Sequence, residues 1–289
     1  MSRKGQASGD QGRISPKSDQ EIARMRRAGQ IVALVLAKLA EAASAGVRTA
    51  ELDQLAETAI RSFGARPSFY GLYGYPANIC VSVNDEVVHG LPGDRALCDG
   101  DIVSFDIGAT VDGMIADAAI TAEVGRASEQ ARQLIRVTRE ALAKGIAQAR
   151  PGNRVADISR AIQRHAESHG YSVVRKLVGH GVGREMHEPP QVPNFVDGGA
   201  SDSPELTPGM TLAIEPMVCQ GGWQVVQERN GWTYRTKDRS LAAHFEHTIA
   251  ITGEGCEILT VRATAGRGRA DASGPAETLP AQTQAGGSP

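Results

Sequence analysis

The hydrophobic positions near the start of the chain follow a helical period. Ser18 and Glu21 have the spacing of a capping box, which marks the first turn of a helix. Apolar or small residues then recur at three- and four-residue steps, at Ile22, Met25, Gly29, Val32, Leu36 and Leu39. Residues so spaced share one helix face, so the pattern predicts an amphipathic helix. A glycine-containing turn and a second helix are expected over residues 45–65.

This helix–turn–helix pattern occurs twice. A shift of 106 residues places Gly46 on Gly152 and Gly64 on Gly170 without a gap, and it also aligns Ala37, Lys38, Arg48, Ala50 and Ser62 with identical residues. We call this internal similarity the first echo. In a second echo, LCDGDIVSFD (97–106) and LTPGMTLAIE (206–215) share a leucine, a glycine three residues later, an alternating strand and a final carboxylate. The two echoes predict a duplicated helix–helix–strand unit with a site between its halves.

The segment at 99–125 has the pattern of a β-hairpin that turns at Val111–Gly113. Hairpin pairing would have to bring Asp106 and Asp117 together, because they are 11 residues apart. Asp112, beside a glycine, is expected to serve the turn. Asp106 lies within an apolar run, where an unpaired carboxylate is costly. A lysine or arginine could neutralise it, but we favour a metal ion.

Two further acids also lie among strand-forming residues. Glu215 ends TLAIE and Glu246 lies in AAHFEHTIAIT, and no lysine or arginine is found inside these strands. Together with the two aspartates and His180 they form an oxygen-rich set with one nitrogen. Such a set suits two divalent ions such as Mn, Fe or Co, and zinc is compatible. A two-metal site activates water, so hydrolysis is expected, with Glu215 placed to accept a proton.

His89 and His187 lie in turns rich in glycine and proline. A core histidine is unusual in such turns. Each could be a solvated loop residue. Alternatively, each could donate a hydrogen bond to a scissile amide and its developing oxyanion.

The composition favours a globular intracellular protein. The 289 residues are 41% hydrophobic and carry a formal charge of −2, without a basic face for DNA. The four cysteines are scattered, and we interpret them as free thiols of a reducing compartment. The sequence shows neither a signal peptide nor a membrane span, so we expect a cytoplasmic protein. We expect a flexible segment at 1–14, one catalytic region at 15–262 with halves at 15–127 and 128–262, and a disordered tail at 263–289.

Five segments in unbroken order resemble the type I methionine aminopeptidases. They are GYPANICVSVNDEVVHGLP, DIVSFDIGATVDGMIAD, GHGVGREMHEPPQVPN, TLAIEPM and GWTYRTKDRSLAAHFEHTIAIT. The resemblance implies an α+β pita-bread fold, in which two related halves enclose a dinuclear centre of Co, Mn, Fe or Zn ions. By resemblance, the metal ligands are Asp106, Asp117, His180, Glu215 and Glu246, with Asp117 and Glu246 bridging. His89 and His187 match the two histidines that face the substrate.

The resemblance also implies a pocket for a methionine side chain. Its lining would include Tyr75, Cys80 and Trp232, with Leu72 and Met186 where aromatic residues are often found. Gly108 stands where a small polar residue is common. These residues leave the pocket apolar, as a thioether requires. The implied reaction removes the initiator methionine from proteins and peptides with a small second residue.

The expected partners are the N-termini of nascent chains. The composition neither supports nor excludes a transient ribosome contact, and DNA and membrane partners are not expected. We expect a monomer.

Two other interpretations remain open from the sequence. An X-Pro aminopeptidase or prolidase would use similar ligand types, although those enzymes usually carry an extra domain before the catalytic one. A metal-free binding module on the same fold would be expected to have lost at least one ligand, whereas all five are present.

Overall fold

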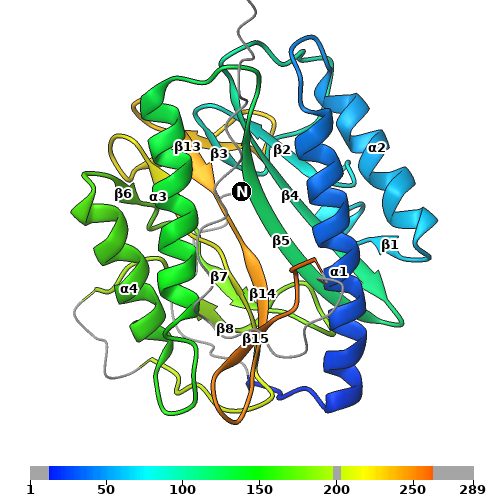
Figure 1. Ribbon diagram of the computed structural model, residues 1–289, viewed down its shortest axis with the longest axis vertical. Coiled ribbons are helices and arrows are strands. Elements are labelled where there is room, and N and C mark those ends of the chain that lie inside the picture. Colours follow the sequence, from blue (N-terminus) through cyan, green and yellow to red (C-terminus); the bar gives the residue numbers. More distant parts are fainter. Residues whose placement is uncertain (1–12, 198–202, 263–289) are drawn as a thin grey trace, which may run out of the picture.

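Two pairs of helices cover one face of a set of antiparallel sheets (Figure 1). The computed structural model describes residues 13–197 and 203–262, so the predicted tail at 263–289 and most of the predicted flexible start lie outside the described residues. The helices are α1 (Asp19–Ala42), α2 (Thr49–Ser62), α3 (Glu129–Ile146) and α4 (Val155–Ser168), and η1 (Leu72–Gly74) is a short 3-10 turn. None of the described helices is long and apolar enough to span a membrane.

The strands fall into two groups. We call α1 to β5 the first half and α3 to β15 the second half. The first half contains β1 (Arg66–Pro67), β2 (Cys80–Val83), β3 (Glu86–Val88), β4 (Ile102–Val111) and β5 (Met114–Glu123). The second half contains β6 (Ser172–Val173), β7 (Gly179–Gly181), β8 (Glu188–Val192), β9 (Thr211–Ile214), β10 (Met217–Cys219), β11 (Val225–Gln227), β12 (Tyr234–Thr236), β13 (Ala242–His244), β14 (His247–Ile251) and β15 (Cys256–Ile258).

Helix α1 begins as the sequence predicts. The Ser18 side chain accepts the Glu21 backbone N–H, and the Glu21 side chain accepts the Ser18 backbone N–H, which completes the capping box. The predicted apolar stripe faces the protein, and its fully buried members include Met25, Val32 and Leu39. The stripe packs on the β2–β4–β5 sheet, and this contact forms the core of the first half.

Helices α2 and α4 occupy equivalent places in the two halves. Both have 14 residues, and they start 106 positions apart, as the first echo predicts. The glycines of the echo have positive φ, 92° at Gly46 and 85° at Gly152, which explains why glycine stands in both turns. The leucines of the second echo also match, because the Leu97 carbonyl accepts the Gly46 N–H and the Leu206 carbonyl accepts the Gly152 N–H.

The predicted hairpin is formed by β4 and β5. The two strands pair from Ile102–Glu123 to Val111–Met114, so the turn consists of Asp112 and Gly113 alone. Both turn residues have positive φ, as the tightest hairpin turns require. Asp112 also pairs with Arg27 of α1 at 3.0 Å.

The two halves meet along β5 and β14. The Glu246 backbone N–H donates to the Ala119 carbonyl at 2.9 Å. Thr248 donates its hydroxyl to the Asp117 carbonyl and accepts the Asp117 N–H. Strand β14 in turn belongs to the five-stranded sheet ordered β15-β14-β9-β7-β8. The predicted acids of the two halves therefore lie on neighbouring strands at this junction.

Candidate metal centre

Strand pairing brings the two aspartates of the first half together. Asp106 lies opposite Ala119, and Asp117 lies opposite Gly108. Residues opposite each other or two apart point to the same face of a sheet, so both carboxyl groups project from one side of the hairpin. Both are buried, with 9% of Asp106 and 4% of Asp117 exposed. The hairpin geometry expected from the sequence is therefore present.

The second half supplies three more groups to the same place. His180 lies on β7 opposite Ala213 of β9, Glu215 follows the end of β9, and Glu246 precedes β14. His180 Nε2 is 3.6 Å from Glu215 Oε1. One ligand atom from each of Asp117, His180 and Glu246 lies within 4.8 Å of the other two. All five predicted groups line a single cavity, together with His89 and His187.

Three carboxylate oxygens in this cavity have no hydrogen-bond partner within residues 13–197 and 203–262. They are Asp106 Oδ1, Asp117 Oδ1 and Glu246 Oε1, and each is buried. Among the described residues, His180 and His244 are the only basic side chains within ion-pair distance of the acids, each 3.6 Å from a Glu215 oxygen, and no lysine or arginine neutralises the acids. Unpaired buried charges are costly, whereas a divalent cation would satisfy all of them. The donor set fits hard or borderline metal ions.

The acids also have raised pKa values. Burial raises the pKa of Asp106 to about 7 and that of Glu215 to about 8. Burial, followed by the neighbouring charge of Asp106, raises the pKa of Asp117 well above its usual range. Burial and the charge of Asp117 do the same to the pKa of Glu246. Four acids so close together cannot all ionise without a positive charge between them.

His180 is oriented for ligation by its second nitrogen. Its Nδ1 lies 2.8 Å from the Gly181 carbonyl oxygen, which can only accept, so Nδ1 carries the hydrogen and Nε2 keeps its lone pair. Burial lowers the pKa of His180 to about 3, so the ring is neutral. A Cβ on Gly179 or Gly181 would overlap the backbone oxygens of Ala213 or Pro189. These glycines therefore let the neighbouring strands approach the one that carries His180.

His89 and His187 reach the cavity from loops. His89 follows β3 with a φ of +58°, a left-handed conformation that is uncommon outside glycine. Burial is the main cause that lowers its pKa to about 4. The exposed His187 ring stacks on Tyr73 at 5.7 Å and lies 4.4 Å from the His180 ring. His187 thus lies between two neighbouring rings, whereas the left-handed backbone at His89 sets the direction of its side chain.

Comparisons with known proteins agree with this geometry. The model of metallopeptidase family M24 matches residues 23–253. The chain is 52% identical to a methionine aminopeptidase of Clostridium acetobutylicum over 246 residues, which are 85% of this chain and 98% of that protein. The chain belongs to the methionine aminopeptidases of family M24. It is therefore a hydrolase that removes N-terminal methionine, and its family implies a divalent metal.

Solved structures of this family and its neighbours confirm the predicted fold. A crystal structure of methionine aminopeptidase from Thermotoga maritima matches with a TM-score of 0.84 and 46% identity, covering 86% of this chain and all of that one. A prolidase from Pyrococcus furiosus matches with a TM-score of 0.70 and 23% identity, and 66% of its length is covered. The prolidase likeness shows the α+β pita-bread fold alone.

The same cavity also has an apolar part. Tyr75, Cys80, Trp232 and Leu72 line it, as the resemblance implies, and Phe69 joins them. The Tyr75 ring meets the Trp232 ring edge-on at 5.1 Å, and its hydroxyl donates to the Ile79 and Gly90 carbonyls.

Met186 is the exception among the predicted pocket residues. It is not among the residues that line this cavity, and instead it is buried against Gly108. A Cβ at Gly108 would lie 2.7 Å from Met186 Cε and 3.0 Å from Phe69 Cε1, which explains the glycine at this position.

Three residues in or beside the cavity were not foreseen from the sequence. Phe69 and Tyr73 line the cavity, although they precede the segment that carries the resemblance. His244 is only 1% exposed, and its Nε2 lies 3.6 Å from Glu215 Oε2. Neither of its ring nitrogens has a hydrogen-bond partner in the part of the chain that the structure describes. The available signal was its place two residues before Glu246 on an apolar strand.

Proposed function

We propose that this chain removes the initiator methionine from nascent proteins and peptides whose second residue is small, in the cytoplasm and as a monomer. The catalytic region is residues 15–262, whose halves at 15–127 and 128–262 enclose the site. Two divalent ions are its cofactors, and Co, Mn, Fe and Zn all suit the donor set. Asp106, Asp117, His180, Glu215 and Glu246 would hold these ions, and by resemblance Asp117 and Glu246 would be the shared ligands.

The unpartnered carboxylate oxygens at the junction of the halves carry this proposal. Four acids and one neutral imidazole converge there, and three of the acids bury an oxygen that has no hydrogen-bond partner among the described residues. A single ion would leave part of this charge unbalanced. The number of acidic groups therefore supports a pair of ions.

The chain's own residues account for proton transfer and substrate orientation. When bound, two divalent ions lower the pKa of a water molecule and polarise the peptide carbonyl. Glu215 is the least buried of the four acids, and its carboxylate is placed to accept a proton and return it to the leaving amine. His89 and His187 donate hydrogen bonds to the scissile amide and to the oxygen on which negative charge develops.

The apolar pocket selects the side chain. Tyr75, Cys80, Trp232, Phe69 and Leu72 surround the end of the cavity, beside the acids. An unbranched thioether adapts to such a lining and gains contacts with aromatic rings. The Cys80 thiol is buried, and burial is the main cause that raises its pKa, so it acts here as a small apolar group.

Peptide hydrolysis separates this function from the prolidase alternative. The metal-loaded full-length protein is expected to cleave Met-Ala-Ser and a Met-Gly tripeptide, and to leave Ala-Pro peptides intact. Cleavage of Ala-Pro peptides at a comparable kcat/KM would favour the alternative.

Two substitutions test the residue roles. Asp106→Ala is expected to lose both bound metal and activity, because it removes a metal ligand. His187→Ala is expected to keep its metal but to turn over slowly, because it removes only a hydrogen-bond donor. Metal content is measured by elemental analysis after dialysis. Equal metal loss in both variants would contradict this division of roles.

A further inference from the structure

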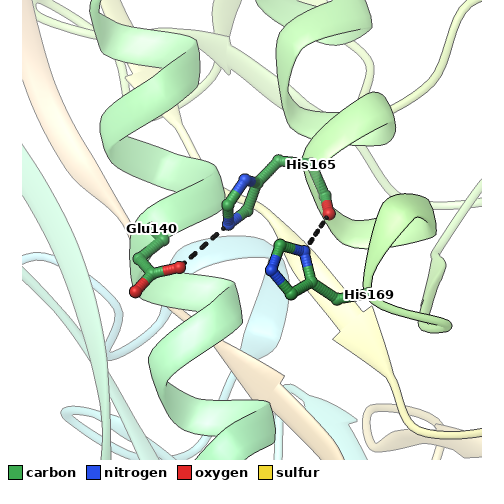
Figure 2. Close-up of side chains that lie close together, drawn as sticks. All are labelled: Glu140, His165 and His169. Atoms are coloured by element: carbon green, nitrogen blue, oxygen red, sulfur yellow. Dashed lines mark hydrogen bonds and ion pairs between the residues drawn. The ribbon is translucent and has the colours of Figure 1, made fainter.

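Two histidines lie apart from the central cavity. Of the chain's seven histidines, five line the cavity or lie within two residues of Glu246. His165 and His169 lie instead at the end of α4, where they face Glu140 of α3 (Figure 2). His165 Nε2 is 3.1 Å from Glu140 Oε2, and the two imidazole centres are 4.6 Å apart. One ligand atom from each of the three residues lies within 4.8 Å of the other two.

We propose that Glu140, His165 and His169 bind a divalent transition-metal ion of the zinc type on the outer surface formed by α3 and α4. Histidines four residues apart present both rings on one side of a helix, as metal sites require. Two imidazoles and a carboxylate form a known zinc donor set that leaves a position open. Donor atoms on a tetrahedral zinc ion lie about 3.3 Å apart, given its bond lengths. The spacing between His165 and Glu140 already meets this requirement.

The hydrogen bond of His169 prepares it for this role. Its Nδ1 is 2.8 Å from the His165 carbonyl oxygen, which can only accept, so Nδ1 carries the hydrogen and Nε2 keeps its lone pair. Figure 2 shows the second nitrogen on the side of the ring that faces His165 and Glu140. Metal-binding histidines usually donate their other ring N–H to a carbonyl or carboxylate in this way. When His165 Nε2 binds the ion, the ring hydrogen moves to Nδ1.

The helix pair does not need these three side chains for its packing. A shift of 106 residues places Glu140, His165 and His169 on Leu34, Ala59 and Phe63 of the first half. There Ala59 is buried in the core, and Lys38 Nζ lies 5.9 Å from the Phe63 ring centre. The same helix arrangement is thus built without a ligand group. The polar set is a property of the second half alone.

Such an ion would join two helices and share no residue with the central site. Its binding would stabilise the folded state, because the unfolded chain does not hold the three ligands together. The outer ion is therefore expected to affect stability and metal content without affecting peptide hydrolysis.

Zinc binding to the full-length protein tests the outer site. Equilibrium dialysis is expected to give one equivalent less of bound zinc for His169→Ala and for Glu140→Gln than for the unmodified chain. Glu167→Gln is the matched control, because it removes a carboxylate of α4 that binds Gln163 and leaves the three ligands intact. The control is expected to bind the full amount, and all variants are expected to keep their aminopeptidase activity. Equal zinc content in all four proteins would overturn the proposal.

Thermal unfolding separates the outer site from the central one. Saturating zinc is expected to raise the Tm of Asp106→Ala, whose central site is impaired, by on the order of 5 °C. The same variant carrying His169→Ala in addition is expected to lose this rise. If zinc raises the Tm of both proteins equally, the outer site does not exist, whatever the outcome for the central metal.

Discussion

The first and second halves of the molecule have the same arrangement of helices over strands, but they contribute different side chains to the cavity and to the outer helix surface. In the first half, α1 and α2 cover the hairpin that carries Asp106 and Asp117. In the second half, α3 and α4 cover the strands next to Glu215 and Glu246. Each half contributes two acids. The second half adds His180, while the first half adds most of the apolar pocket.

The turns before α2 and α4 have the same residue and conformation in both halves, whereas the outer faces of the helices carry different residues. Gly46 and Gly152 keep a positive φ because side chains are strained in that conformation. On the outer helix faces, Phe63 and His169 occupy corresponding places without any such constraint. The backbone conformation of the turns thus requires glycine in both halves, whereas the outer helix surface accepts different side chains at corresponding positions. The following substitutions compare corresponding positions.

The largest effect is expected at the two corresponding acids, Asp106 and Glu215. Glu215→Gln should lower kcat by about 10²–10⁴-fold, because the amide cannot accept the proton that a general base takes. Added metal should not restore this activity. Asp106→Asn should recover a large part of its activity at high metal concentration, because the proposed role of Asp106 is to hold metal and not to transfer a proton. Steady-state kinetics across a metal titration measures both, and recovery of Glu215→Gln would show that the two acids have the same role.

The next largest effect is expected at Gly108, which corresponds to the fully buried Met217 after a shift of 109 residues. Gly108→Ala would place a Cβ 3.0 Å from Phe69 Cε1 and 3.1 Å from Ser68 Cβ. Overpacking of this kind costs about 1–3 kcal/mol. Because Phe69 lines the pocket, KM for methionine peptides should rise as well. Urea unfolding and kinetics check the two effects.

A matched control for Gly108 lies in the same half. A Cβ on Gly93 would meet no atom within 4 Å, so Gly93→Ala should leave both stability and KM nearly unchanged. An equal loss of stability in the two variants would mean that glycine content, and not the contact with Phe69, limits stability.

The sequence was sufficient for the elements that periodicity and turn chemistry determine. The capping box at Ser18, the hairpin turn at Asp112 and the start of α4 all lie where the pattern predicts them. The apolar surroundings of Asp106 also predicted that it needs a partner. By contrast, Phe69 and His244 reach the site through the pairing of distant strands, which no local pattern encodes.

The outer histidines illustrate a second limit. His165 and His169 have helical spacing in the sequence, but Glu140 joins them only because α3 packs on α4. Met186 packs in the same apolar cluster as Tyr75 and Cys80, but its side chain lies against Gly108 and is not among the residues that line the cavity. Both findings depend on which surfaces of the helices and strands pack together. The sequence alone shows only which of these surfaces are apolar.

A smaller effect is expected from Glu21, the third residue after the Ser18 cap of α1; the third residue after the Ser128 cap of α3 is Ala131. Glu21 accepts two hydrogen bonds from Arg184, in the loop that carries His187, and one from the Ser18 backbone. These bonds lower the pKa of Glu21 from 4.5 to about 2, with Arg184 as the main cause. Glu21→Gln should reduce the free energy of unfolding at pH 7 by about 1–2 kcal/mol, because solvent screens the partly exposed pair.

The pH dependence of this effect has a definite sign. A carboxylate with a depressed pKa in the folded state stabilises the protein above its unfolded pKa of 4.5, and this stabilisation is lost as the pH falls toward 2. The difference between the unmodified chain and Glu21→Gln should therefore be constant from pH 7 to about 5.5 and shrink below that. Denaturant unfolding at a series of pH values measures it. A difference that grows as the pH falls would exclude the ion pair as its source.

The smallest effect is expected at Glu51 and Asp157, which cap α2 and α4 at positions 106 residues apart. Each accepts a backbone N–H, from Arg48 and Arg154 respectively, at 2.8 Å. In Glu51→Gln and Asp157→Asn the amide oxygen can still accept this bond, but the negative charge that favours a helix N-terminus is lost. Thermal unfolding should show equal decreases in Tm of at most about 4 °C, additive in the double variant because the two caps share no partner. Unequal decreases would show that the two helix starts, although alike in backbone, differ in how much each half depends on them.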